Sequence, residues 1–352
     1  MVVSFSGDKN FLEGLKKDKA PFLLGCCVTE TSEIEGITQA GIEGMIYLTP
    51  TLDSEFLCDG EVKSLEDLAK TPKGVPTPAL ITRAVSLETP FSSIEILNLG
   101  FEKKPQIKNA KVHDFGIKPS GRIDQNAKID AREIFEKGKA FAKEFKTKSD
   151  YIILAETTPA GTTTAYATAL ALGYEAKGLF SSSFKDNPKS IKEEVVQKAL
   201  NHIDKKMDTF ERLSVVSDNM LIFSAGFAME ASFEKKVILG GGTQMAAVMI
   251  IIDRLLKEGE KACIENIALA TTRWVYEDPN SDIEKLLSNL SFTPNAFYGD
   301  MSFKDSKLDI LKLYDKGEAK EGVGAGAAIV YGYLRGLKQE DILQGVQRLL
   351  GV

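Results

Sequence analysis

A stretch rich in hydroxyl groups, AETTPAGTTTA, stands between a pattern typical of a strand and one typical of a helix. Glu156 opens this loop, and Gly161 is followed by three threonines, Thr162, Thr163 and Thr164. The N-terminus of a helix presents unpaired backbone N–H groups, which bind anions and above all phosphate. Because Gly161 lets a ligand approach the backbone and the threonines add donors, the stretch predicts a phosphate site. The structural alternative is an ordinary threonine cap on a strand-to-helix turn.

The same loop differs from the P-loop of nucleoside triphosphatases. That loop needs a Gly-Lys-Ser/Thr sequence whose lysine reaches the β- and γ-phosphates, and the stretch contains no lysine. A monophosphate therefore suits the loop better than a triphosphate.

A second glycine-rich turn follows another apolar strand pattern, in VILGGGTQMAAVMI. Its three consecutive glycines are Gly240, Gly241 and Gly242. They favour either a cradle for a phosphate or sugar or close packing of a strand against a helix. The dinucleotide fingerprint Gly-x-Gly-x-x-Gly is missing, so the turn does not predict a dinucleotide site.

A third turn, KEGVGAGAA, places an acid beside glycines. Glu321 directly precedes Gly322, and Gly324 follows before a helix of small residues. A carboxylate at the rim of a cleft can act as a general base, since burial raises its pKa toward the useful range. The alternative is an exposed acid stabilised by the dipole of the helix that it precedes.

Composition excludes several other classes of site. The chain has 352 residues, a net charge of −6, only two histidines and four cysteines without a Cys-x-x-Cys motif. We therefore expect no metal, no histidine-based triad, no nucleic-acid partner and free buried thiols. His113 has an acidic neighbour but is interpreted as a loop residue. Without a signal or membrane segment in view, we expect a cytoplasmic protein.

Short apolar runs alternate with helical patterns along the chain. Such alternation indicates a three-layer α/β/α fold around a mostly parallel, Rossmann-like sheet. Strands are predicted at 21–28, 45–50, 79–85, 151–156, 236–242 and 266–274, and helices at 32–42, 130–146, 162–172 and 243–259.

We expect residues 1–352 to form a single large α/β domain. A smaller helical subdomain is predicted around residues 184–220, with parts of the N- and C-termini. Residues 98–128, rich in proline, glycine and charge, are interpreted as a long excursion near the site or a subunit interface.

The three turns, in this order, resemble the nicotinate-nucleotide–dimethylbenzimidazole phosphoribosyltransferase family of cobalamin synthesis. The family's phosphate loop reads Gly-Glu-Met-Gly-Ile-Gly-Asn-Thr-Thr-Ala, and its C-terminal motif Leu-Gly-Glu-Gly-Ser/Thr-Gly-Ala-Ala is similar to AKEGVGAGAA. LGGGTQMAAV looks like the family's Leu-Gly-Gly-Leu-Glu-Ile-Ala-Ala. The resemblance covers roughly residues 150–352. The bacterial Pro-Pro-Gly-Ser-Leu-Gly segment near the N-terminus is missing, and the family's His-rich loop is replaced by FYGDMSFKDSKLDILKLYD. The chain therefore looks like a divergent, archaeal branch.

The resemblance implies a reaction without a cofactor. Nicotinate mononucleotide would donate ribose 5-phosphate to a benzimidazole-like or purine base, with Glu321 as the base that removes the acceptor proton. Glu156 would orient the loop or contact a ribose hydroxyl. A homodimer is implied too. Arg83 and Arg273, near predicted strand ends, would approach a carboxylate or phosphate, or else form ordinary salt bridges.

Three other functions stay open at this point. One is a transferase or hydrolase acting on another phosphorylated nucleotide or sugar, and a second is a nucleotide-binding protein without turnover. The third is an α/β protein whose glycines only permit close packing. Glu321 discriminates a transferase from a binding protein, because a binding protein would tolerate its replacement by glutamine.

Overall fold

The computed structural model describes residues 1–15 and 18–352, and its centre is one eight-stranded sheet. The strand order is β1-β8-β7-β6-β5-β2-β3-β4, and only the pairing of β1 with β8 is antiparallel. The predicted mostly parallel α/β fold is therefore confirmed. The strands are β1 Val2–Ser6, β2 Pro21–Cys26, β3 Ser93–Asn98, β4 Lys111–Asp114, β5 Tyr151–Thr157, β6 Lys236–Gly240, β7 Ile267–Thr272 and β8 Asn295–Gly299.

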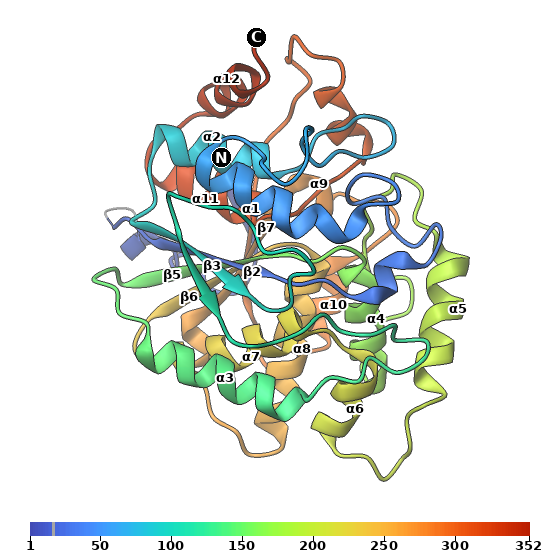
Figure 1. Ribbon diagram of the computed structural model, residues 1–352. Helices are drawn as coiled ribbons and strands as arrows, with labels where there is room; N and C mark the ends of the chain where they lie inside the picture. The colour runs from blue at the N-terminus through green and yellow to red at the C-terminus, as the bar shows by residue number, and fades with distance from the viewer. Residues whose placement is uncertain (16–17) are drawn as a thin grey trace.

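Helices cover both faces of this sheet (Figure 1). On the upper face in that view lie α1 Thr49–Asp59, α2 Ala79–Glu88, α11 Ala325–Leu334 and α12 Gln339–Leu349. On the lower face lie α3 Ala131–Glu144, α7 Asn219–Ala231 and α8 Thr243–Lys257. The remaining helices are α4 Gly161–Ala171, α5 Lys189–Leu200, α6 Thr209–Val216, α9 Arg273–Tyr276 and α10 Ile283–Ser288, and the 3₁₀ turns are η1 Glu13–Leu15, η2 Glu30–Glu33, η3 Ile46–Leu48, η4 Ile264–Asn266 and η5 Leu311–Lys316.

Strand β5 shows why the sheet needs two covered faces. Every one of its residues is buried. Tyr151 and Ile153 pack with the core under α2 and α11, whereas Ile152 and Leu154 pack with the core under α3 and α7. Successive side chains of a strand point to opposite faces, so a continuous apolar run requires helices on both sides.

The chain reverses its direction of travel across the sheet between β2 and β5. After β2 it adds β3 and β4 on one side, and then returns to β5 and adds β6, β7 and β8 on the other. Ligands of open parallel sheets bind beyond the carboxyl ends of the strands at such a switch point. The fold therefore directs attention to the loops that follow β2 and β5.

Two predicted strands, 45–50 and 79–85, are wrong because each is helical. The first contains η3 and the start of α1, and the second is the body of α2. Pro50 lies in the first turn of α1 and Pro78 directly precedes α2. Proline favours helix starts as well as strand ends, and a short apolar run does not tell a buried helix from a strand.

The predicted helix at 32–42 is also wrong. The segment contains only the end of η2 and then loops, with Gly36 and Gly41 at φ of +74° and +129°. Glycines at positive φ break a helix that the apolar spacing alone would favour.

The sequence prediction missed four strands. β1, β3 and β8 lie outside every predicted strand, and β4 lies inside the excursion predicted at 98–128. β4 is an edge strand of four largely exposed residues, so it carries no apolar pattern to detect. His113, interpreted as a loop residue, lies on this strand.

Helices were expected at 184–220 and are present as α5, α6 and the beginning of α7. α5 and α6 pack against α4 at one end of the sheet (Figure 1), whereas α7 packs between α3 and α8. The separate helical subdomain stays a prediction.

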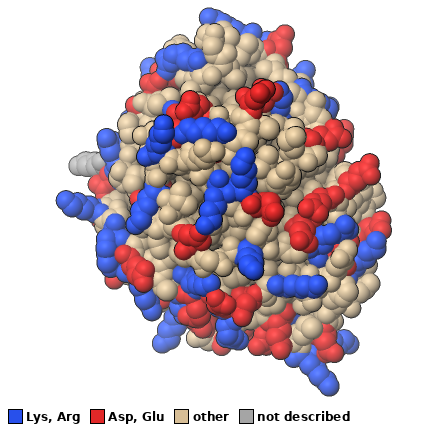
Figure 2. All heavy atoms as spheres, viewed as in Figure 1, with Lys and Arg blue, Asp and Glu red and all other residues tan. Residues whose placement is uncertain are grey.

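Surface charges of both signs are interspersed over the face seen in Figure 2. Cys26, Cys27 and Cys58 are buried free thiols, and Cys263 is a partly buried one. Within residues 1–15 and 18–352, none of the helices has the length and apolar character needed to cross a membrane.

Candidate active site

A cleft of about 850 Å³, including its open mouth, lies beyond the carboxyl ends of β5 and β6. It is bounded by the N-termini of α4 and α8 on one side and by the loops around α1 and α2 on the other. The lining residues are 38, 40–41, 49, 53, 69–71, 75–78, 156–162, 181–183, 242–244, 275 and 319–322.

The first of the three glycine turns forms one wall of this cleft. A Cβ atom on Gly161 would lie 2.3 Å from the Nε2 atom of Gln244, so a side chain there would displace the Gln244 amide. Gln244 donates to Glu156 Oε2 at 3.2 Å and to the Thr158 carbonyl at 3.4 Å. The start of α8 therefore fixes the loop that leads into α4.

The three threonines at the start of α4 point in different directions. Thr162 lines the cleft. Thr163 and Thr164 are fully buried and do not line it. Thr164 donates to the Gly161 carbonyl at 2.9 Å and also bonds to Asp218, so it caps the first turn from inside.

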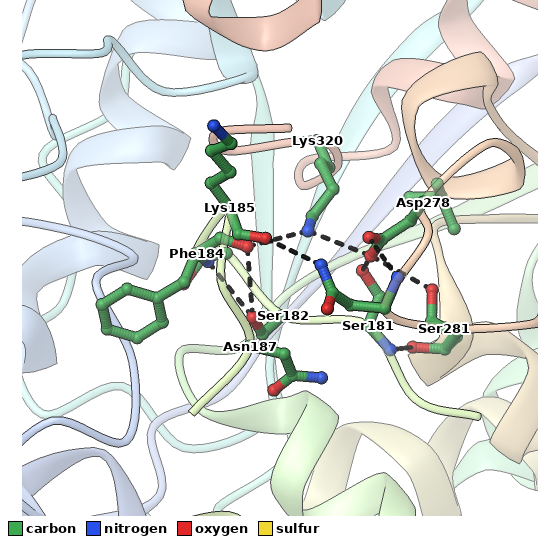
Figure 3. A network of polar contacts seen from close by, with 12 residues as sticks. Ser181, Ser182, Phe184, Lys185, Asn187, Asp278, Ser281 and Lys320 are labelled. Carbon is green, nitrogen blue, oxygen red and sulfur yellow. Dashed lines mark hydrogen bonds and ion pairs between the residues drawn. The ribbon is translucent and has the colours of Figure 1, made fainter. Parts of the chain in front are cut away.

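Two buried lysines at the cleft carry no sequence motif and were not predicted. Lys192 of α5 is 3% exposed and donates from Nζ to Thr162 Oγ1 at 2.7 Å and to the Ser181 carbonyl at 2.8 Å. Lys320 is 1% exposed and forms an ion pair with Asp278 at 3.0 Å (Figure 3). No motif marks either lysine, because each belongs to a segment that contacts α4 only in the folded chain.

Lys192 bonds to Thr162 and Ser181, which line the cleft, and Lys320 lines it directly. The pKa of Lys192 is lowered to about 7, first by burial and then by the nearby Lys320, while Asp278 opposes the shift. Burial also lowers the pKa of Lys320. Two buried ammonium groups thus share one buried carboxylate, and a bound anion would restore the charge balance.

Glu321 lies across the cleft, at the N-terminus of α11. Its carboxylate accepts the Gly326 N–H at 3.1 Å to one oxygen and 3.2 Å to the other, and the Gly322 N–H at 3.2 Å. Burial raises the pKa of Glu321 to about 8, although these N–H donors act in the opposite direction. A carboxylate held in this range suits a general base near neutral pH.

Glu156 lies between the two ends and is 4% exposed. Burial raises its pKa well above the usual value, and the nearby Glu321 and Asp218 raise it further. Glu156 also lines the cleft, so its carboxyl group can contact a hydroxyl of a bound ligand.

The glycines of the second and third turns divide into two groups. Gly242 and Gly322 line the cleft, whereas Gly240, Gly241 and Gly324 do not. A Cβ on Gly240 would lie 2.7 Å from the Cβ of Ala327, and one on Gly324 would lie 2.5 Å from the Cβ of Ala155. These two glycines permit α11 to pack against the sheet, so the packing alternative holds for them.

Neither arginine singled out from the sequence lines the cleft. Arg83 lies on α2 rather than at a strand end, and donates to the Leu57 carbonyl at 2.7 Å. Arg273 does follow β7, but it pairs with Glu277, Asp300 and Asp315. Arg273 therefore forms ordinary salt bridges, which was the alternative interpretation of this residue.

The opposite wall of the cleft comes from the N-terminal part of the chain. Among the described lining residues of this wall, Asp53 of α1 is the one acid. Its carboxylate accepts hydrogen bonds from Thr77 Oγ1 at 2.7 Å and from Thr157 Oγ1 at 2.8 Å. Burial raises the pKa of Asp53 to about 6. The other lining residues of this wall are small, polar, proline or single aliphatic ones: Thr38, Ala40, Gly41, Thr49, Ala69, Lys70, Thr71, Val75, Pro76, Thr77 and Pro78.

Metal-binding chemistry finds no support in the described part of the chain. There, no three His, Cys, Asp or Glu side chains are grouped so as to hold a metal ion. His113 pairs with Glu95 at 2.8 Å on the two strands at the sheet edge and does not line the cleft.

Comparisons with known proteins identify relatives at two levels. A UPF0284 protein of Sulfurisphaera tokodaii is 37% identical over 351 residues, which are 99% of this chain and 97% of that protein. The UPF0284 protein of Sulfolobus acidocaldarius is 37% identical over 331 residues, 93% of each chain. These relatives agree with the expected archaeal branch. No protein-family model matches the chain.

Two solved structures share the fold at low sequence identity. One is nicotinate-nucleotide-dimethylbenzimidazole phosphoribosyltransferase from Thermus thermophilus, with a TM-score of 0.61, 14% identity, and coverage of 95% of this chain and 83% of that one. The other is CobT from the same organism, with a TM-score of 0.59, 14% identity, and coverage of 98% and 95%. The expected likeness to this fold is thus confirmed.

Proposed function

The chain belongs to the UPF0284 protein family, and we propose that it is a phosphoribosyltransferase acting on nicotinate mononucleotide. The observation that carries the proposal is a cleft that has the start of α4 at one end, where Lys192 bonds to Thr162, and the carboxylate of Glu321 at the other. A phosphorylated donor matches the first end, and an acceptor with an acidic N–H matches the second. A fold neighbour from Thermus thermophilus carries the same activity in its name.

The donor phosphate binds at the start of α4. Thr162 supplies a hydroxyl, Lys192 supplies a charge, and the first turn of α4 supplies backbone N–H groups. A helix N-terminus and a nearby ammonium group both favour a phosphate dianion. The ribose then lies along Glu156 and Gly242 toward the second end of the cleft.

Glu321 acts on the acceptor base. Its carboxylate takes the proton of the ring N–H, and the ring nitrogen forms a bond to C1′ of the ribose. The bond from C1′ to the pyridine nitrogen breaks, and its electron pair stays on nicotinate, which leaves as a neutral ring. Attack from the opposite side converts the β-nucleotide into an α-riboside phosphate for the cobalamin lower ligand.

No general acid is needed in this reaction, because the leaving nitrogen is already cationic. A positioned general base contributes about 10²–10⁴-fold to rate. Alignment of the two rings in the cleft contributes a comparable or larger factor.

Two alternatives are distinguished by the same site. A nucleotide-binding protein without turnover would keep the phosphate end and be indifferent to Glu321. An enzyme acting on another phosphorylated nucleotide or sugar would use the same phosphate end with a different leaving group.

The decisive experiment is an assay of the purified protein with nicotinate mononucleotide and a panel of bases. The panel contains 5,6-dimethylbenzimidazole, 5-hydroxybenzimidazole and adenine, and mass spectrometry measures released nicotinate and α-riboside phosphate. We expect product with wild type and a kcat loss of about 10²–10⁴-fold in Glu321→Gln, with donor affinity changed little. Glu340→Gln, an exposed residue of α12, is the matched control.

Calorimetry with nicotinate mononucleotide separates the remaining outcomes. Binding without any product would favour the non-catalytic alternative or another acceptor. The absence of binding would overturn the phosphate site and with it the proposed reaction.

Assembly and location follow the same analogy. We propose a cytoplasmic homodimer on the resemblance stated above. Light scattering of the purified protein at micromolar concentration should give the mass of two subunits. The mass of a single subunit would contradict the dimer proposal.

A further inference from the structure

The turn that carries Glu321 has an unusual backbone. Three non-glycine residues adopt the left-handed conformation within it: Ala319 at φ +62°, Lys320 at +60° and Val323 at +54°. Gly322 and Gly324, at φ +153° and +63°, complete the turn. Side chains rarely adopt these angles, and a β-branched valine least of all. Such a backbone persists only where its surroundings impose it, and it is common at functional sites.

Hydrogen bonds from other elements hold this turn along its backbone. The Ala319 N–H donates to the Ser183 carbonyl at 3.1 Å, and Thr272 Oγ1 donates to the Lys320 carbonyl at 2.7 Å. Val323 is held at both ends, since its N–H donates to the Glu156 carbonyl at 2.9 Å and its carbonyl accepts Thr82 Oγ1 at 2.8 Å. The conformation around Glu321 is thus imposed by four separate parts of the fold.

Lys320 adds a buried charge to these restraints. Its side chain extends into a polar network around Asp278 and Phe184 (Figure 3). There Nζ donates to the Phe184 carbonyl at 2.8 Å and pairs with Asp278 at 3.0 Å. Asp278 also accepts the hydroxyls of Ser181 at 2.8 Å and Ser281 at 3.1 Å.

The same network reaches the phosphate end of the cleft. Ser181 lines the cleft, and its carbonyl accepts the Nζ of Lys192, which also bonds to Thr162. Lys320 and Lys192 are therefore linked through Asp278 and Ser181. The turn that holds Glu321 and the start of α4 share a common support.

We propose that Lys320 is a positioning residue, which holds the strained turn so that the Glu321 carboxylate faces the acceptor over the bound donor. The inference rests on the proposed transferase reaction for its effect on rate. Lys320 takes no direct part in the reaction, because its ammonium group is bound to Asp278 and to the Phe184 carbonyl. Without this anchor, the strained backbone relaxes, and a displacement of about 1 Å at a reacting group can reduce rate about 100-fold.

The test compares Lys320→Met with the double variant Lys320→Met/Asp278→Asn. The single change leaves the Asp278 carboxylate buried and short of a cation, which destabilises the fold. The double variant removes that charge and keeps the packing, so it separates positioning from folding. Lys312→Met, which loses only a surface pair with Asp309, is the control.

Hydrogen exchange of the backbone amides is the first measurement, because it does not depend on activity. We expect faster exchange at Gly322, Val323 and Gly326 in both variants, with exchange in α7 and β6 unchanged. The control should leave every one of these rates at its wild-type value. Unchanged exchange at the turn in the double variant would overturn the inference, whatever reaction the protein catalyses.

Steady-state kinetics is the second measurement. We expect kcat to fall about 10–100-fold in the double variant while KM for nicotinate mononucleotide changes less than about threefold. If wild type forms product and the double variant restores wild-type kcat, Lys320 serves folding alone and the inference is wrong. If wild type forms no product but exchange responds as expected, the proposed reaction fails and the positioning of the turn stands.

Discussion

The two walls of the cleft are built in different ways. The donor wall uses ends of parallel strands, a helix N-terminus and buried charges, with Lys192 anchored to Thr162. The acceptor wall uses loops before and after α1, with Asp53 among small and polar side chains. A phosphate group needs fixed donors and charge, which a packed sheet provides, whereas loops can change without disturbing the core. We therefore propose that the donor wall sets the reaction class and that the acceptor wall sets the choice of base.

Gln39 links the loop before α1 to the segments around Ser183 and Glu318. Its Nε2 donates to the Ser183 carbonyl at 2.6 Å and to Glu318 Oε2 at 2.7 Å. Lys73 pairs with the other oxygen of Glu318. The loops of the acceptor wall are thus tied to segments that carry the donor wall and Glu321.

The largest expected effect is the pH dependence of turnover, which reports on Glu321 where the walls meet. Because its pKa is raised to about 8, the carboxylate is mostly protonated at pH 6 and mostly ionised at pH 9. A base must be ionised to accept a proton, so kcat should rise about 90-fold over this range and level off above pH 8. Saturating donor and acceptor are used throughout. A profile that is flat between pH 6 and 9 would contradict the role of Glu321.

Lys192 provides the next effect, and it belongs to the donor wall alone. Lys192→Met should weaken nicotinate mononucleotide binding about 10–100-fold, since hydrogen bonds to charged groups contribute about 1.5–3 kcal/mol. Calorimetry measures this change, and KM for the acceptor should stay near the wild-type value. Lys198→Met, on the exposed side of the same helix, is the control.

The pH dependence of donor binding sharpens this comparison. Burial and the nearby Lys320 lower the pKa of Lys192 to about 7, while Asp278 opposes the shift, so Lys192 loses its charge above about pH 7. The donor Kd should therefore rise above pH 7 in the wild type, opposite in direction to the gain in kcat. This rise should be absent in Lys192→Met. Parallel changes in the two proteins would show that another group binds the phosphate.

The smallest effect is expected at the acceptor wall. Asp53→Asn replaces an acceptor of two threonine hydroxyls with a side chain that also donates. We expect the ratio of kcat/KM for adenine to that for 5,6-dimethylbenzimidazole to change about 3–10-fold, as for one neutral hydrogen bond. Donor affinity should not change. Asp305→Asn, at an exposed aspartate, is the control, and equal losses for both bases in Asp53→Asn would remove the distinction between the walls.

The sequence was most informative where function depends on the backbone. The turns after β5 and β6 were recognisable because a strand pattern, glycines and a helix pattern follow one another within a few residues. The helical α1 and α2 were predicted as strands, since their apolar runs are short and their prolines mark a helix start. The acceptor wall depends on these two helices, so local sequence patterns could not predict its structure.

By itself, the sequence determined the parallel α/β sheet, the loop before Thr162 and the acid before Gly322. These are local features, because the periodicity of a strand or helix and a glycine-rich turn each depend only on residues close together in the sequence. Only the tertiary structure decided that Lys192, Lys320 and Asp278 surround that loop, that Gly240 and Gly324 serve packing, and that Arg83 and Arg273 lie elsewhere. Burial and pairing arise between segments far apart in the chain, so their charges and pKa values exist only in the folded protein.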